Sequence, residues 1–112
     1  MEFNQLVFFQ FDNLVQNRIP FLLVNLGVDL SGWYKSVWAM HIENNTLSTT
    51  PENAIEDIKA KNLPLHHAIV VVDQDGKVSG EIAQALDKLG FLNAYSLRGG
   101  LNGMAEEKKG AL

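Results

Sequence analysis

The chain has 112 residues, the usual size of one domain, and we expect a single domain over residues 1–112. Apolar residues make up 46% of the sequence and charged residues 20%, which supplies a hydrophobic core and excludes a disordered chain. The net charge of −4 opposes binding to a phosphate backbone, so nucleic acid is not an expected partner.

The sequence contains no cysteine. The chain therefore forms no disulfide-linked assembly, no thiolate metal site and no thiol nucleophile. The first residues lack the basic segment and long apolar stretch of a secretory signal, and the longest apolar runs are far shorter than the roughly 20 residues of a membrane span. We therefore expect a cytoplasmic protein without membrane association.

The N-terminal half contains one clear strand signal and several weaker ones. Residues 7–9 predict an edge strand, and Asp12 is expected to cap a short helix that continues to Asn17. Residues 21–24 form an unbroken apolar run, which is typical of a strand buried on both faces of a parallel sheet. Residues 40–42 predict a further strand on weaker evidence.

The next segment predicts a helix followed by a second buried strand. Thr50 as N-cap and Pro51 at the first helical position predict a helix that ends near residues 62–64. Its apolar stripe consists of Ala54, Ile55 and Ile58. Residues 68–72 then form a second unbroken apolar run.

The C-terminal part alternates helix and strand. A helix is expected from Ser79 to about Leu89, and Gly90 is expected to end it as the C′ residue. The apolar face of this helix is expected to consist of Ile82, Ala85, Leu86 and Leu89. Residues 94–97 predict a strand and residues 101–108 a terminal helix. The alternation predicts a three-layer α/β domain, in which helices cover both faces of a five-stranded, mainly parallel sheet.

The loop after the second apolar run is the candidate site, because function in such sheets gathers at the carboxyl ends of central strands. Its backbone N–H groups and the following helix N-terminus are expected to form an anion cradle. Two carboxylates in the loop oppose an anion, and the simpler interpretation is that they turn the chain and cap the helix. The loop consists of Asp73, Gln74, Asp75, Gly76, Lys77, Val78 and Ser79.

Residues 68–104 resemble the rhodanese-like superfamily. Members of that family carry a catalytic Cys in a loop patterned Cys-x-x-Gly-x-Arg-Ser, then a Gly-Phe corner and a Leu-x-Gly-Gly ending. The matching positions here are Gly76, Ser79, Gly90, Phe91, Gly99 and Gly100. Residues 21–27 and 35–40 match the N-terminal half of the family only loosely, without its polar signatures.

The resemblance implies a rhodanese-like fold without sulfurtransferase activity, because Asp73 stands at the position of the family's Cys and Val78 at that of its Arg. A carboxylate cannot accept a sulfane sulfur as a persulfide. We expect a silent module that binds or regulates a protein partner. We also expect a loop carboxylate to accept the N–H bonds of the cradle, so that anions bind weakly or not at all.

Two other interpretations are open from the sequence. Asp73 and Asp75 resemble the first motif of haloacid-dehalogenase-type phosphatases, in which one Asp is the nucleophile and the second a general acid in the presence of magnesium. Trp33, Tyr34 and Trp38 form an aromatic cluster that is either core or a partner surface. The spacing of Asp and Glu fails the pattern of a calcium loop, so we expect no metal and no cofactor.

Overall fold

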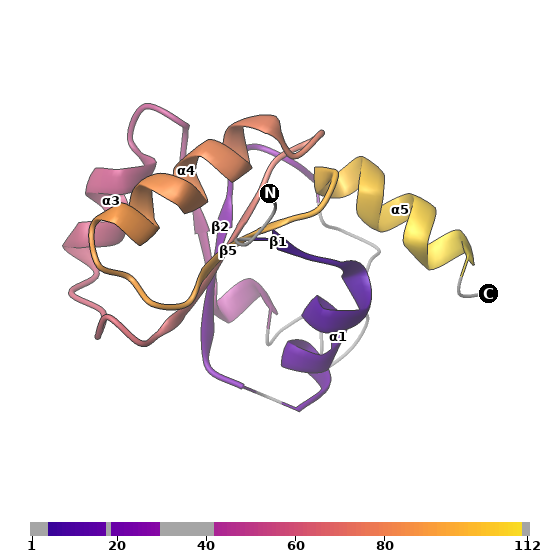
Figure 1. Cartoon of the computed structure of the whole chain (residues 1–112), viewed down its shortest axis with the longest axis horizontal. Coiled ribbons are helices and arrows are strands. Elements are labelled where there is room, and N and C mark those ends of the chain that lie inside the picture. Colours follow the sequence, from indigo (N-terminus) through magenta and orange to yellow (C-terminus); the bar gives the residue numbers. More distant parts are fainter. Residues whose placement is uncertain (1–4, 18, 30–41, 111–112) are drawn as a thin grey trace.

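The computed structural model describes residues 5–17, 19–29 and 42–110. Strands and helices alternate along most of the chain (Figure 1). In chain order the elements are β1 (Gln5–Leu6), α1 (Phe8–Gln16), β2 (Phe21–Asn25), β3 (Thr46–Ser48), α3 (Ala54–Ala60), β4 (Ala68–Val72), α4 (Lys77–Lys88), β5 (Ala94–Leu97) and α5 (Gly100–Gly110).

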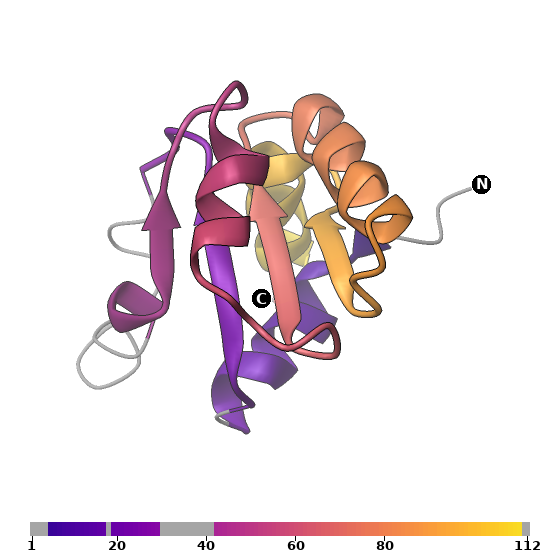
Figure 2. The same ribbon diagram turned by 90° about the vertical axis from the view of Figure 1, so that its left-hand side faces the viewer.

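The five strands form one sheet in the order β1-β5-β4-β2-β3, and every pair is parallel (Figure 2). The central strand β4 begins opposite β2, where Ala68 pairs with Phe21, and it continues beside β5, where Ile69 pairs with Ala94. The sequence prediction of a five-stranded, mainly parallel sheet is confirmed. Both unbroken apolar runs lie in its interior, since each has a strand on either side.

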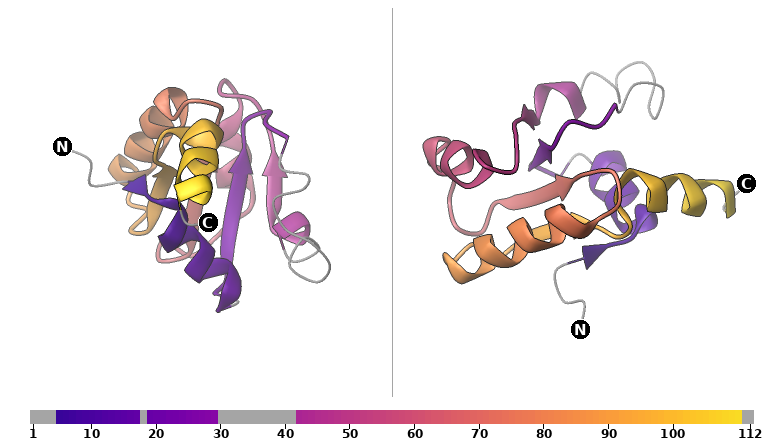
Figure 3. Two further views of the ribbon diagram at one scale, coloured as in Figure 1. Left: turned by 90° about the vertical axis from the view of Figure 1, so that its right-hand side faces the viewer. Right: turned by 90° about the horizontal axis from the view of Figure 1, so that it is seen from above.

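Helices cover both faces of the sheet, so the domain has three layers. Successive residues of a strand point to opposite faces, and Leu22 and Val71 pack on one side against Ile58 of α3 and Leu86 of α4. On the other side, Val70 and its neighbours pack against Phe11 and Val15 of α1 and Met104 of α5. Figures 1 and 3 show these two pairs of helices on opposite sides, with the far end of α5 projecting beyond the sheet.

The predicted strand at residues 7–9 is wrong. The edge strand β1 ends at Leu6, and α1 begins at Phe8 after Val7, whose N–H donates to the Gln10 side chain at 3.0 Å. Phe11 and Val15 recur at helical spacing and are buried, and this period outweighs the strand propensity of the Val-Phe-Phe run.

Asp12 lies inside α1 and does not cap it, so that prediction is also wrong. The strand expected at residues 40–42 falls mostly outside the described residues, and Ile42 belongs to a helical turn buried in the core. The strand of this region is β3, which forms the second edge of the sheet. Just before it, the Asn45 carbonyl accepts a bond from the Leu23 N–H of β2 at 2.8 Å.

Two helix starts differ from the sequence prediction, and one residue of a predicted apolar face is exposed. Helix α3 begins at Ala54, because the Asn53 N–H closes a turn onto the Thr50 carbonyl before the helix starts. Helix α4 begins two residues before Ser79, and Gly76 is its N-cap. Leu89 is 47% exposed and does not belong to the buried face. Gly90, with φ of +102°, ends α4 as expected. None of the described helices is long and apolar enough to span a membrane.

Candidate functional site

Residues 73–79 lie where the sequence places them, at the carboxyl end of the central strand β4, and the last three form the first turn of α4. Gly76 has φ of +89°, a left-handed conformation that other residues rarely adopt. This glycine turns the chain so that the N–H groups at the start of α4 point back toward Asp73. The site is therefore built from one strand end and one helix start.

The Asp73 side chain fills the concave side of this loop. Its Oδ1 accepts bonds from the Gly76 N–H at 2.6 Å and the Ser79 hydroxyl at 2.9 Å. Its Oδ2 accepts bonds from the N–H groups of Val78 and Ser79, both at 3.0 Å. The side chain is only 7% exposed, so one carboxylate satisfies four donors inside the protein.

These bonds confirm the prediction that a loop carboxylate occupies the cradle, and they show which one does so. Asp75 is exposed, and among the described residues it accepts a bond from the Lys77 N–H alone, at 3.1 Å and outside the cradle. The Ser79 hydroxyl also donates to the Asp73 carboxylate. The Asp73 carboxylate, which precedes the N-cap Gly76, thus accepts the N–H groups of Val78 and Ser79 in the first turn of α4.

The start of α5 forms a second wall of the site. The N–H of Leu101 donates to the Asp73 carbonyl at 2.8 Å, and the N–H of Asn102 donates to the Gln74 carbonyl at 3.0 Å. The Gln74 side chain also donates to Asn102 Oδ1 at 2.7 Å. The first N–H groups of both helices therefore donate to the loop. Those of α4 donate to the Asp73 carboxylate, and those of α5 donate to the backbone carbonyls of the loop.

Glycines permit this close approach. A Cβ on Gly100 would lie 2.5 Å from the Asp73 carbonyl oxygen, and one on Gly76 would lie 3.0 Å from the Gly99 nitrogen. A Cβ on Gly103 would lie 2.2 Å from the Arg98 carbonyl oxygen. Sequence reasoning missed Gly103 and Asn102, although three glycines at positions 99, 100 and 103 were the available signal for a tight turn.

The loop after β2 lies beside the site, because the Leu26 N–H donates to the Val72 carbonyl at 3.0 Å just before the loop begins. The Asn25 side chain holds this neighbouring loop, accepting a bond from the Val28 N–H at 2.8 Å and donating to the Val28 carbonyl at 2.9 Å. Trp33, Tyr34 and Trp38, the candidate partner surface, lie outside the described residues.

The filled cradle determines the chemistry of the site. An anion entering it would have to displace a carboxylate with four hydrogen bonds, and would meet that negative charge at close range. The phosphatase interpretation requires an Asp73 oxygen to attack phosphorus, yet both oxygens accept two bonds each. In the part of the chain that the structure describes, no three His, Asp or Glu side chains gather as metal ligands. No observation favours that interpretation.

The chain matches the family model of the rhodanese-like domain over residues 36–107. It therefore belongs to the rhodanese-like domain family. The five-stranded parallel sheet and its covering helices agree with this assignment, and the chain has no cysteine with which to form a persulfide. A search of curated proteins finds no match to the chain.

Proposed function

We propose that this chain is a non-catalytic rhodanese-like module that binds or regulates another protein through residues 73–79, which lie at the carboxyl end of the central strand. The observation that carries the proposal is the Asp73 carboxylate, which occupies the anion cradle and satisfies its donors internally. Sulfur transfer needs a thiolate in this place, and a carboxylate oxygen cannot form a persulfide.

The outer surface of the loop supports a binding role. Gln74, Asp75, Lys77 and Val78 are exposed on it, while the backbone beneath them is held by Asp73 on one side and by α5 on the other. A surface that is fixed before binding loses little conformational entropy when a partner docks. Loops supported by a rigid scaffold are also where proteins most often place recognition residues.

The wild-type chain is expected to transfer no sulfur from thiosulfate or mercaptopyruvate to cyanide or a thiol, because it has no sulfur nucleophile. Asp73→Cys alone should restore little activity, since Asp75 remains and Val78 supplies no cation for an anionic donor. The triple variant, Asp73→Cys with Asp75→Ser and Val78→Arg, also removes the remaining loop carboxylate and adds a cation. It therefore tests whether the scaffold can still support sulfur transfer. Turnover of the wild type above a heat-inactivated control would contradict the proposal.

The binding role is tested by affinity capture from the source cells, followed by quantitative mass spectrometry. The loop variant combines Lys77→Ala with Val78→Ser, which trims two exposed side chains and keeps the backbone bonds to Asp73. The matched control combines Lys59→Ala with Gln84→Ser, two exposed positions on α3 and α4.

We expect proteins that the wild type and the control retain equally and that the loop variant retains about tenfold less, the effect of losing a contact of about 1.4 kcal/mol. Identical sets of retained proteins for the loop variant and the wild type would show that this surface is not the binding site.

A further inference from the structure

The two edges of the sheet differ in how well their outward backbone groups are paired. Strand β3 is one edge and β1 is the other, and Figure 2 shows β3 at one margin of the sheet. An edge strand presents N–H and C=O groups to which a further strand can bind. The hydrogen bonds of the two edge strands therefore decide which of them can accept one.

The bonds between β3 and β2 determine which groups of β3 point outward. The Leu23 N–H donates to the Asn45 carbonyl at 2.8 Å, and the Thr49 N–H donates to the Asn25 carbonyl at 3.0 Å. The backbone groups of successive residues point to opposite sides of a strand, so residues 45, 47 and 49 face β2. The N–H and C=O groups of residues 46 and 48 therefore point away from the sheet.

Thr46 and Ser48 form the outward side of this strand, which we call the β3 edge. None of the described residues donates to or accepts from their main-chain N–H and C=O groups on that side. The two N–H groups are about 6.6 Å apart, the two-residue repeat of a strand. The strand contains no proline, lysine or bulge, which are features that commonly block an edge.

The β1 edge is closed by comparison. The Arg98 N–H donates to the Leu6 carbonyl at 2.8 Å, so Leu6 faces β5 and the N–H of Val7 points outward. That N–H donates to the Gln10 side chain at 3.0 Å, and α1 begins at Phe8. Two successive outward N–H groups without a described partner are therefore found at β3 and not at β1.

The side chains of β3 alternate between apolar and polar. Leu47 is partly buried and packs against the core cluster that contains Ile58 of α3, whereas the side chains of Thr46 and Ser48 point to the opposite face. Directly opposite residues of neighbouring strands contact each other, so an apolar residue on an added strand would cover the exposed part of Leu47. The β3 edge thus fits an extended segment in which apolar and polar residues alternate.

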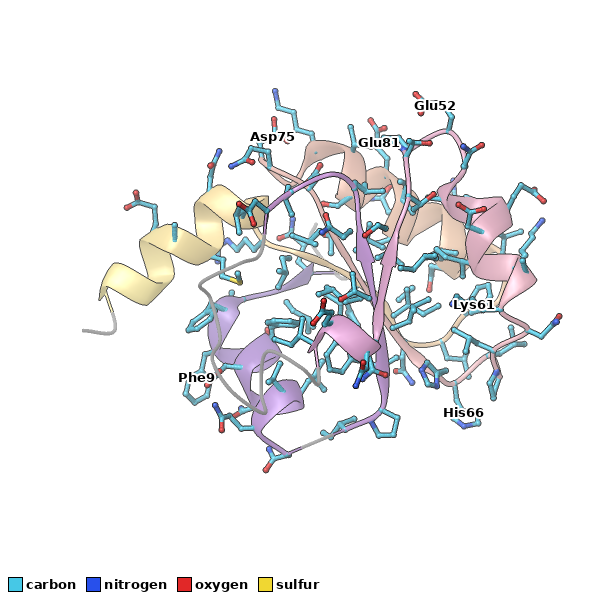
Figure 4. All side chains as sticks on the ribbon, turned by 180° about the vertical axis from the view of Figure 1, so that it is seen from behind. Phe9, Glu52, Lys61, His66, Asp75 and Glu81 are labelled. Carbon is cyan, nitrogen blue, oxygen red and sulfur yellow. The ribbon has the colours of Figure 1, made fainter. Side chains whose placement is uncertain are left out.

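The strand and the turns at its two ends are acidic. Residues 42–52 include Glu43 and Glu52 and contain no lysine or arginine. Both carboxylates are exposed, and neither has an ion pair with another described residue. The Thr46 hydroxyl donates to the Ile42 carbonyl at 2.6 Å, which holds the turn that contains Glu43 against the start of β3. Figure 4 shows Glu52 at the end of the sheet where the strands finish.

We propose that the β3 edge binds an extended cationic segment of another protein, which adds a strand to the sheet. Its main chain pairs with Thr46 and Ser48, and its lysine or arginine side chains lie near the two glutamates. A second copy fits less well, because pairing across a two-fold axis brings Glu43 of one chain toward Glu52 of the other, and each chain has a net charge of −4. The inference does not depend on what residues 73–79 bind.

Fluorescence anisotropy tests the proposal with a labelled peptide, Lys-Thr-Val-Thr-Val-Thr-Lys, blocked at both ends. We expect the full chain to bind it with a dissociation constant below about 1 mM. Ser48→Pro removes one outward N–H and leaves the bonds to β2 intact, so it should weaken binding about tenfold or more. Ser48→Ala is the matched control, since it keeps that N–H and is expected to bind like the wild type.

Two further peptides separate backbone pairing from charge. N-methylation of the three central residues should abolish binding to the wild type, and glutamate in place of both lysines should weaken it about tenfold. Absence of binding to the wild type, or equal binding of either altered peptide, overturns the proposal even if Ser48→Pro does not fold. Equal binding by Ser48→Pro and Ser48→Ala also overturns it. Wild-type dimers that Ser48→Pro abolishes would assign the edge to a second copy and overturn the choice of partner.

Discussion

Asp73→Ala is expected to lower the free energy of unfolding by about 3 kcal/mol. The substitution removes the acceptor of the N–H groups of Gly76, Val78 and Ser79, and of the Ser79 hydroxyl. A buried donor left without an acceptor costs about 1–3 kcal/mol, and rearrangement of the loop recovers part of this loss. Urea unfolding followed by circular dichroism measures the change.

Two variants identify the cause of that change. Asp73→Asn keeps one acceptor oxygen and is expected to cost roughly half as much, because its amide group cannot accept the remaining N–H bonds. Asp75→Ala removes one exposed bond, to the Lys77 N–H, and should cost about 0.5 kcal/mol or less. If Asp73→Ala and Asp75→Ala proved equally mild, the carboxylate would not be the group that holds the loop together.

Gly100→Ala is expected to destabilise the fold by about 3 kcal/mol or more. Gly100 has φ of +63°, and its added Cβ would lie 2.5 Å from the Asp73 carbonyl oxygen and 2.7 Å from the Asp75 nitrogen. The start of α5 would have to move away from the loop, and the Leu101 N–H would lose its bond to the Asp73 carbonyl. Thermal and urea unfolding of the variant measure the loss.

Gly27→Ala is the matched control, because Gly27 also has a positive φ, of +91°, but an added Cβ would meet no atom within 4 Å. We expect this variant to cost about 1 kcal/mol, the strain of a left-handed backbone alone. The difference between the two variants measures the close approach of α5 to the Asp73 loop. An equal loss of stability in Gly100→Ala and Gly27→Ala would mean that the start of α5 can move away from the Asp73 loop at no cost in free energy.

Together these contacts show how the domain satisfies the N–H groups of the cradle from within the chain. The start of α4 donates to the Asp73 carboxylate, and the start of α5 donates to the carbonyls of Asp73 and Gln74. Helix N-termini bind anions when their first N–H groups are free. In this chain an internal carboxylate takes that place, so we expect the loop to contribute to the stability of the fold.

Much of the architecture followed from local patterns. The unbroken apolar runs at residues 21–24 and 68–72 predicted strands with neighbours on both sides, and these are β2 and the central β4. Burial on both faces requires apolar residues at every position, so this signal is present in the sequence alone. The absence of cysteine likewise excludes persulfide chemistry from residue types alone, because no other side chain supplies the sulfur nucleophile.

Other features depended on contacts between distant segments. Whether the Val-Phe-Phe run became strand or helix was decided by the packing of Phe11 and Val15 against the sheet, a burial that local propensity does not encode. The exposure of Leu89 followed from the path of the chain around Gly90, although its spacing matched the buried face of α4.

The candidate site shows the same division. The sequence placed two carboxylates in the loop and predicted that one of them would take up the N–H bonds. Only the tertiary structure assigned that role to Asp73 and left Asp75 exposed, because the turn at Gly76 brings the start of α4 back over the end of β4. The close approach of Gly100 joins segments more than 20 residues apart along the chain. Local patterns report which residues are buried, whereas the direction of a side chain in a loop depends on the segments that fold around it.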